Sequence, residues 1–293
     1  MFKGSIVAIV TPFKKGKVDE TKLKELVEFQ IKNGTQGIVP CGTTGESPTL
    51  SHIEHTRVIE TCIDAVAGRV PVIAGTGSNS TAEAVELTQH AADAGASGAL
   101  IVSPYYNKPT QEGLYQHFKT IAKNVNIPII LYNIAGRTAV NIEPTTIARL
   151  AKDCKNIVGV KEASGLLDQI QMIKYLCPKD FILLSGDDIL TLPILSVGGV
   201  GVISVAANIV PKDILKVINL FNEGQLKDAQ DLHYKLLPLY KSLFIETNPI
   251  PIKEAMGMVE LCSAEMRLPL CPMSETNRGK LKAALQEYGL LKG

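Results

Sequence analysis

The chain has 293 residues, of which 45% are hydrophobic and 20% are charged. This apolar content excludes intrinsic disorder, and a net charge of +1 with interspersed basic and acidic residues argues against a nucleic-acid-binding surface. We therefore expect one large globular unit whose partner is a small molecule.

The first apolar run of the chain ends at Pro12 and is too short for a signal peptide. No other apolar run approaches the length that spans a membrane. The sequence therefore predicts a cytoplasmic protein with no membrane partner. Its six cysteines form no Cys-x-x-Cys pair and show no metal-ligand spacing, so we expect buried, reduced thiols.

Eight short apolar runs follow one another along the chain, at 5–10, 37–40, 71–76, 98–103, 128–132, 156–160, 181–185 and 201–205. None of them alternates with polar residues, which is typical of parallel strands that are buried on both faces.

Helical patterns separate these runs, for example at 19–34, 51–68 and 80–95. Ser51-x-x-Glu54 and Ser80-x-x-Glu83 predict capping boxes at two helix starts, while Gly34 and Gly95 suit the residue after a helix end. The chain is thus an alternation of strands and helices.

Eight strand–helix units within residues 1–224 predict a (β/α)8 TIM barrel. A doubly wound sheet is disfavoured because the first turn lacks the G-x-G-x-x-G motif. From residue 225 the strand signals stop, and 225–244, 249–261 and 274–291 predict three helices. We therefore expect an α/β fold with a catalytic barrel at 1–224 and a C-terminal helical domain at 225–293, which packs on the barrel or on another subunit.

Barrel enzymes carry their chemistry at the carboxyl ends of the strands, and Lys161 follows one predicted strand directly. Desolvation there favours the neutral amine, which attacks ketones to form a Schiff base. A salt bridge with Glu162 is the structural alternative. Tyr132 ends the preceding strand and could relay protons, or it could simply fill the mouth of the barrel.

Two further groups that follow predicted strands are suited to carboxylates. The turn Gly42-Thr43-Thr44-Gly45 is no P-loop, but its N–H groups and hydroxyls could hold a carboxylate, although a plain turn before a capped helix explains it equally. Arg137 offers a fixed cationic fork, or it is an ordinary surface arginine.

Metal and phosphate chemistry are less well supported. The five histidines fall mostly on predicted helices, so no metal cluster is expected. The glycines at 198–201 precede their strand, which places them at the bottom of the barrel and disfavours a sugar-phosphate substrate.

Four motifs, at 42–47, 132–138, 159–165 and 248–257, together resemble the 4-hydroxy-tetrahydrodipicolinate synthase (dihydrodipicolinate synthase) family in order and spacing. The resemblance covers essentially the whole chain. It implies a pyruvate-dependent class I aldolase on a barrel with a C-terminal helical domain, assembled as a tetramer, a dimer of dimers. The implied reaction condenses pyruvate with L-aspartate 4-semialdehyde, the first committed step toward diaminopimelate and lysine. No metal or organic cofactor is implied.

The resemblance also implies roles for the strand-end residues. Lys161 would form the Schiff base with pyruvate, and Tyr132, Thr43 and Tyr106 would relay protons, with Tyr106 supplied by a neighbouring subunit. One departure is Ala135, where the family commonly has proline, which questions the rigidity of the loop that carries Arg137.

Substrate binding would involve five positions. Thr43 and Thr44 would hold the pyruvate carboxylate, and Arg137 would receive the carboxylate of the semialdehyde. Ile203 would line the pocket, and we also expect Gly186, at another strand end, to contact substrate.

In regulated members of the family the end product, L-lysine, is bound at a second site between subunits. The matching residues here are Ser47, His52, His55, Asn79, Glu83 and Tyr105. We expect inhibition by lysine, with Glu83 pairing with one of its amines. The alternative is that Glu83 only closes its capping box. Pro48 departs from the small residue common in the family.

The residues alone leave two other functions possible. One is another aldolase of the superfamily, such as an N-acetylneuraminate lyase or a keto-deoxy sugar acid aldolase, although Arg137 is usually replaced by an apolar residue in the sialic-acid enzymes. The other is a catalytically silent barrel that binds a keto acid, which the presence of Lys161, Tyr132 and Thr43 argues against.

Overall fold

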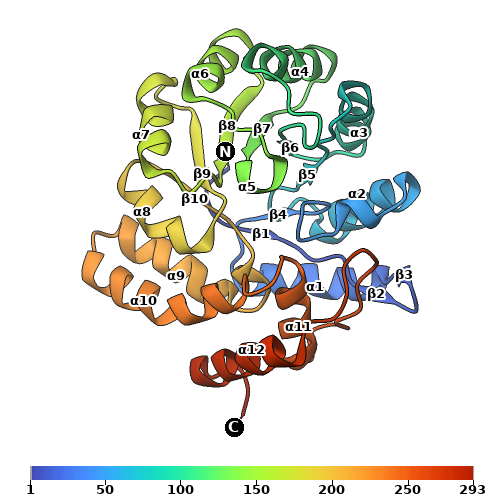
Figure 1. Cartoon of the computed structure of the whole chain (residues 1–293), viewed down its shortest axis with the longest axis vertical. Helices are drawn as coiled ribbons and strands as arrows, with labels where there is room; N and C mark the ends of the chain where they lie inside the picture. Colours follow the sequence, from blue (N-terminus) through green and yellow to red (C-terminus); the bar gives the residue numbers. More distant parts are fainter. Residues whose placement is uncertain (1, 293) are drawn as a thin grey trace.

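The computed structural model describes residues 2–292 and contains an eight-stranded barrel (Figure 1). The strands are β1 (Gly4–Ala8), β4 (Gly37–Val39), β5 (Ile73–Gly75), β6 (Gly98–Val102), β7 (Ile129–Asn133), β8 (Ile157–Glu162), β9 (Ile182–Ser185) and β10 (Gly201–Ser204). All neighbouring strands pair in parallel, and a bridge between Ile38 and Val72 closes the circle. The predicted (β/α)8 barrel is confirmed, and each predicted strand lies within two residues of the observed one.

Helices cover the outside of the barrel. They are α1 (Glu20–Lys32), α2 (His52–Val66), α3 (Thr81–Asp93), α4 (Gln111–Asn124), α6 (Pro144–Asp153), α7 (Leu167–Leu176), α8 (Thr191–Ser196) and α9 (Pro211–Asn222). Shorter elements lie in the loops: the hairpin β2 (Phe13–Lys14) and β3 (Lys17–Val18), the helix α5 (Ala135–Thr138), and the 3-10 turns η1 (Ser47–Thr49), η2 (Asp188–Leu190) and η3 (Ala206–Asn208).

Side-chain caps set the start of several helices. The Ser51 hydroxyl accepts from the N–H of Glu54, whose carboxylate accepts in return from Ser51, so the predicted capping box of α2 is confirmed. At α3 the prediction is half wrong. Ser80 accepts from the N–H of Glu83, but the Glu83 carboxylate turns away to Ser78 and His52.

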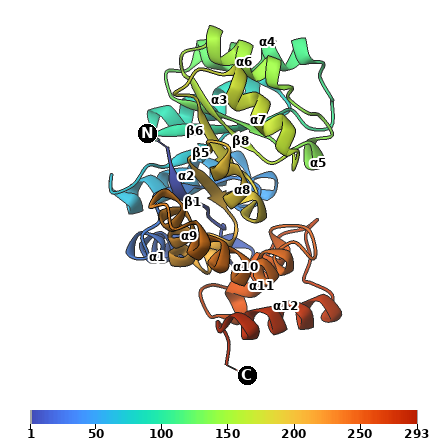
Figure 2. The ribbon, with the colours of Figure 1, turned by 90° about the vertical axis from the view of Figure 1, so that its left-hand side faces the viewer.

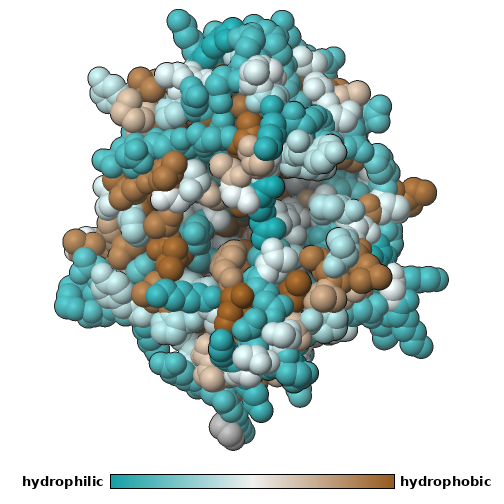
Figure 3. Space-filling view, viewed as in Figure 1, coloured by the Kyte–Doolittle hydropathy of each residue, from teal (hydrophilic) through white to brown (hydrophobic). Residues whose placement is uncertain are grey.

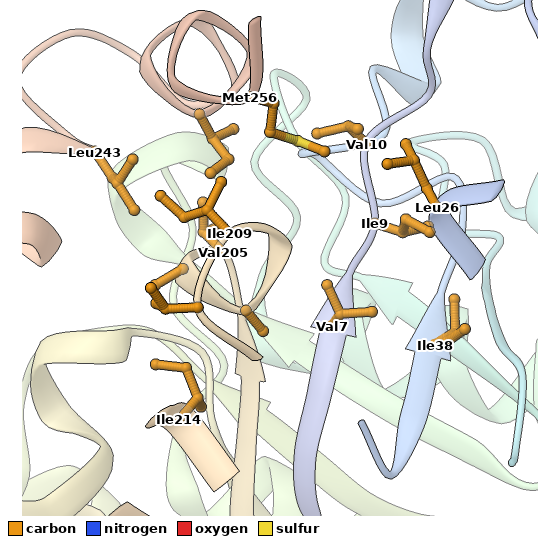
Figure 4. Close-up of a cluster of buried hydrophobic side chains, with 14 of the residues drawn as sticks. Val7, Ile9, Val10, Leu26, Ile38, Val205, Ile209, Ile214, Leu243 and Met256 are labelled. Atoms are coloured by element: carbon orange, nitrogen blue, oxygen red, sulfur yellow. The ribbon is translucent and has the colours of Figure 1, made fainter. Parts of the chain in front are cut away.

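Three helices follow the barrel, as the sequence predicts: α10 (Leu226–Ser242), α11 (Ile250–Met258) and α12 (Glu275–Tyr288). In Figure 2 they lie together below the barrel. Side chains of α1, α9, α11, β1 and β4 share one buried hydrophobic cluster (Figure 4). Because α10 also packs into this cluster, the helices are fastened to the barrel, and a domain boundary at residue 224 stays a prediction.

Cysteine placement corrects one expectation. All six thiols are free, and burial raises the pKa of Cys41, Cys62, Cys154, Cys177 and Cys262. Cys271, however, is exposed, because it lies in the irregular segment between α11 and α12 rather than on a packed helix or strand.

Candidate active site

The centre of the site is a buried lysine near the end of β8. Lys161 is 6% exposed and pairs in register with Tyr132 of β7. Its Nζ atom lies 4.1 Å from the centroid of the Tyr132 ring. None of the ion pairs formed within residues 2–292 includes this ammonium group. A buried amine without a counter-ion is available, once deprotonated, to attack a carbonyl carbon.

The proposed alternative of a Lys161–Glu162 salt bridge is wrong. Successive side chains of a strand point to opposite faces, so Glu162 points away from the barrel interior. Its carboxylate accepts from Asn133 Nδ2 at 3.1 Å and from the N–H of Ser164 at 2.7 Å. Burial raises the pKa of this carboxyl group against the opposing effect of those donors. Lys161 and Glu162 therefore do not interact with each other: the lysine faces the barrel interior, and the carboxylate bonds to Asn133 and Ser164.

Strands β9 and β10 shape the space around Lys161. A Cβ atom on Gly186 would lie 3.1 Å from Lys161 Cε and 2.7 Å from Ala163 Cβ, so glycine leaves the room that the lysine occupies. Ile203 is 1% exposed and belongs, with Tyr132, to the hydrophobic cluster inside the barrel. Burial raises the pKa of Asp187, and the charge of Lys161 opposes that rise.

The turn after β4 presents two threonines. Gly45 and Glu46 donate from their N–H groups to the carbonyl oxygens of Gly42 and Thr43, at 3.1 Å each. Within the described chain, the N–H groups of Thr43 and Thr44 donate no hydrogen bond. Consecutive free N–H groups and hydroxyls in a tight turn can bind an anion.

Asn248 connects this turn with Arg137. Its Nδ2 donates to Thr44 Oγ1 at 3.1 Å, and its carbonyl oxygen accepts from Arg137 Nη2 at 3.0 Å. Arg137 lies on α5, which begins at Ala135. Although the guanidinium is exposed, the Asn248 carbonyl holds it in place. This contact orients Arg137 at the surface, and its role in binding a carboxylate stays a prediction.

A cavity of about 420 Å³ opens at this end of the barrel. Thr43, Tyr132 and Arg137 line one part of it, and Figure 3 shows the corresponding face of the molecule hollowed near its centre. Its size and mixed apolar and polar walls suit a small organic acid.

The residues assigned to lysine binding line the same cavity, with the exception of Asn79. His52 Nε2 lies 3.0 Å from Glu83 Oε1, and Glu83 also accepts from the Ser78 hydroxyl. The Glu83 carboxylate thus faces the cavity rather than its own helix start, so the capping-box alternative for this residue is wrong.

Backbone carbonyl groups hold two other residues assigned to lysine binding, His55 and Asn79. His55 Nε2 lies 2.9 Å from the carbonyl oxygen of Gly75, and burial lowers the pKa of this histidine. Its Nδ1 atom is buried and has no partner within residues 2–292. Asn79 Nδ2 donates to the carbonyl oxygen of Tyr105 at 3.2 Å, which brings these two junctions together.

Tyr106 is the relay residue that the described chain leaves out of the cavity, whereas Thr43 and Tyr132 line it. Its side chain is 89% exposed, it does not line the cavity, and its backbone is left-handed, with φ of 72°. A left-handed backbone is unfavourable for a residue with a bulky side chain.

Reasoning from the sequence missed Asn248 and the buried pair formed by Glu46 and Lys253. All three lie within the motifs at 42–47 and 248–257, but the sequence alone indicated no role for them.

Among residues 2–292, no three His, Cys, Asp or Glu side chains lie close enough together to hold a metal ion. Nor does any helix there have the length and apolarity needed to cross a membrane.

The barrel, the unpaired buried lysine at a strand end and the adjacent tyrosine define an enzyme of the class I aldolase type, which binds a carbonyl substrate as an imine. The model of the dihydrodipicolinate synthetase family matches residues 1–288. The chain belongs to this family.

Individual relatives agree over the full length. The chain is 60% identical over 292 residues to the 4-hydroxy-tetrahydrodipicolinate synthase of Endomicrobium trichonymphae, covering 100% of both chains. The crystal structure of dihydrodipicolinate synthase from Aquifex aeolicus is 53% identical, with a TM-score of 0.98 and 100% coverage of both chains. The enzyme from Cyanidioschyzon merolae, solved with lysine bound, is 43% identical, with a TM-score of 0.97 and 99% coverage of both.

Proposed function

We propose that the chain is a lyase that condenses pyruvate with L-aspartate 4-semialdehyde to 4-hydroxy-tetrahydrodipicolinate, through an imine between pyruvate and Lys161. The observation that carries this proposal is the buried Lys161 ammonium, which has no carboxylate partner among residues 2–292 and lies 4.1 Å from the centroid of the Tyr132 ring. Membership of the dihydrodipicolinate synthetase family supports it over another aldolase of the superfamily or a silent barrel.

The chemistry follows from the positions of the side chains. The Lys161 amine attacks the keto carbon of pyruvate, and loss of water gives the imine. The imine withdraws electrons, so a proton leaves the methyl carbon and an enamine forms, which attacks the aldehyde carbon of the second substrate. The amine of that substrate then attacks the imine carbon, closes the ring and displaces Lys161. Because the imine itself serves as the electron sink, we propose that no cofactor takes part.

Proton transfers at these steps need a relay, which we assign to Tyr132, Thr43 and Tyr106. Tyr132 contacts Lys161, and Thr43 lines the cavity. The free N–H groups of Thr43 and Thr44 support their assignment to the pyruvate carboxylate. Gly186 and Ile203 would leave room for the pyruvate methyl group and enclose it.

Replacing Arg137 with alanine is expected to lower kcat/KM for L-aspartate 4-semialdehyde roughly 10- to 100-fold, because a charge-assisted contact with its carboxylate is lost. Imine formation with pyruvate should change little. Borohydride trapping measures the imine, and a coupled assay measures turnover. Arg149→Ala, which removes an exposed arginine from α6, is the control. Equal losses in both measurements would contradict the assignment of Arg137 to the second substrate.

We also propose that L-lysine inhibits the enzyme at the part of the cavity lined by Ser47, His52, His55, Glu83 and Tyr105, with Asn79 placed beside it by its hydrogen bond to Tyr105. The Glu83 carboxylate, freed from its capping box, is placed to bind an ammonium group. The bound lysine in the Cyanidioschyzon merolae relative supports the choice of ligand. Pro48, where the family often has a small residue, also lines the cavity, so we expect the affinity to differ from that of regulated relatives.

L-Lysine is expected to reduce the initial rate of the wild type, with a coupling free energy of about 1–3 kcal/mol. Glu83→Ala should be far less sensitive, because it loses the ion pair with the inhibitor. Glu86→Ala, an exposed residue on the same helix, should be inhibited like the wild type. A wild type that lysine leaves unaffected, or a Glu83 variant inhibited as strongly as the wild type, would refute this proposal.

We further propose a homotetramer, a dimer of dimers, in the cytoplasm. The exposed Tyr106 supports a site completed by a neighbouring subunit. An apolar surface on and beside α7 supports a second contact between copies. Its exposed side chains are Leu166, Leu167, Met172, Tyr175 and Leu176. Exposed apolar patches of this kind commonly mark protein–protein contacts.

A further inference from the structure

A fully buried ion pair joins the C-terminal helices to the barrel. Lys253 Nζ of α11 lies 2.5 Å from Glu46 Oε1, which follows the turn after β4, and both side chains are 0% exposed. Taking two charges out of water is costly, and such a pair is often replaceable by neutral residues without loss of stability. Stability alone is therefore a weak explanation for it.

Hydrogen bonds connect the pair to the turn at 42–46 and to the C-terminal segment, and the Phe13 ring centroid lies 4.2 Å from Lys253 Nζ. Lys253 Nζ also donates to the carbonyl oxygen of Thr11 at 3.0 Å, and the Thr11 hydroxyl donates to the carbonyl oxygen of Gly45 at 2.6 Å. Glu46 Oε2 accepts from the N–H of Arg267 at 3.2 Å. Lys253 thus bonds to the turn directly through Glu46 and indirectly through Thr11, which bonds to Gly45.

Glu46 itself adopts a left-handed backbone, with φ of 53°. In this conformation its N–H donates to the carbonyl oxygen of Thr43 and completes the turn. A left-handed backbone is unfavourable for glutamate and persists only when its surroundings impose it. Among the ion pairs of residues 2–292, Glu46 takes part in the one with Lys253.

The same segment of the chain reaches both substrate-binding groups. Asn248 precedes α11 and bonds to Thr44 through its side chain and to Arg137 through its carbonyl oxygen. A shift of the start of α11 would therefore move the turn relative to Lys161.

We propose that Lys253 is a positioning residue of the active site: its buried ion pair with Glu46 fixes the turn that presents Thr43 and Thr44, and it thereby sets the affinity for the carboxylate of the 2-keto acid. The inference rests on the proposed function, because it takes these threonines to bind pyruvate. Lys253 does not touch substrate, and it acts through the turn.

The test measures pyruvate dependence and stability separately. Lys253→Met is expected to raise the pyruvate concentration for half-maximal imine trapping at least tenfold, with kcat at saturating pyruvate within about threefold of wild type. Arg278→Met is the matched control, since it removes an ion pair between α12 and Glu254, the neighbour of Lys253, without touching the turn. For this control, the pyruvate concentration for half-maximal imine trapping should equal that of the wild type.

A double variant, Glu46→Gln with Lys253→Met, replaces both charged residues by neutral ones and leaves no buried unpaired charge. It distinguishes an effect on pyruvate binding from an effect on folding. We expect its melting temperature to approach that of the wild type while its weak pyruvate affinity persists. Wild-type affinity in this pair, or in Lys253→Met alone, would overturn the inference and leave the proposed function intact. A wild-type protein that traps no pyruvate would instead overturn the proposed function, and the inference with it.

Discussion

Lys161→Ala is expected to abolish both the borohydride-trapped pyruvate adduct and the condensation, with turnover falling roughly a thousandfold or more. The reason is that the whole route runs through an imine, and the alanine variant has no amine at that position. Because Lys161 makes no ion pair within the part of the chain that the structure describes, its removal leaves no carboxylate there without a salt-bridge partner. The folded structure should therefore survive, and the loss should be chemical.

Mass spectrometry of the peptide that contains residue 161 checks this, together with steady-state rates. Lys155→Ala, an exposed lysine just before β8, is the control and should keep both the adduct and the activity. A Lys161 variant that is labelled at another lysine and turns over at the wild-type rate would show that the nucleophile lies elsewhere.

Tyr106→Phe is expected to lower turnover about 10²- to 10⁴-fold, the usual contribution of a positioned proton-transfer group. The phenyl ring keeps the shape of the side chain and loses only the hydroxyl. Since Tyr106 is 89% exposed and absent from the cavity of its own chain, the loss should arise in the site of a neighbouring subunit.

Mixing Tyr106→Phe with Lys161→Ala subunits tests this arrangement. In a hybrid dimer, one of the two sites combines an intact lysine with an intact tyrosine from the other chain. Random exchange should then restore roughly a quarter of the wild-type activity. Subunits that exchange, as shown by native mass spectrometry, and yet recover no activity would place Tyr106 outside the shared site.

The barrel could be predicted from the sequence because parallel strands buried on both faces are continuous apolar runs, and eight such runs leave little choice of fold. The place of Lys161 followed from the same rule, since a residue after a buried run lies at the mouth of the barrel. These inferences depend on local patterns, which the amino-acid order contains directly.

The contacts that the sequence did not reveal are long-range or depend on side-chain direction. Glu83 has the spacing of a capping box, yet its carboxylate turns to His52, which lies on another helix. Asn248 contacts Arg137 across 111 positions of the chain. Neither contact can be predicted from neighbouring residues in the sequence, because each joins segments that become adjacent only in the folded chain.

The exposed Cys271 has a practical consequence. The other five thiols are buried, and their raised pKa values keep them protonated and unreactive at neutral pH. A maleimide dye should therefore attach at one place, in the connection between α11 and α12. Such a labelled protein would report by fluorescence on the C-terminal helices while the catalytic groups stay chemically untouched.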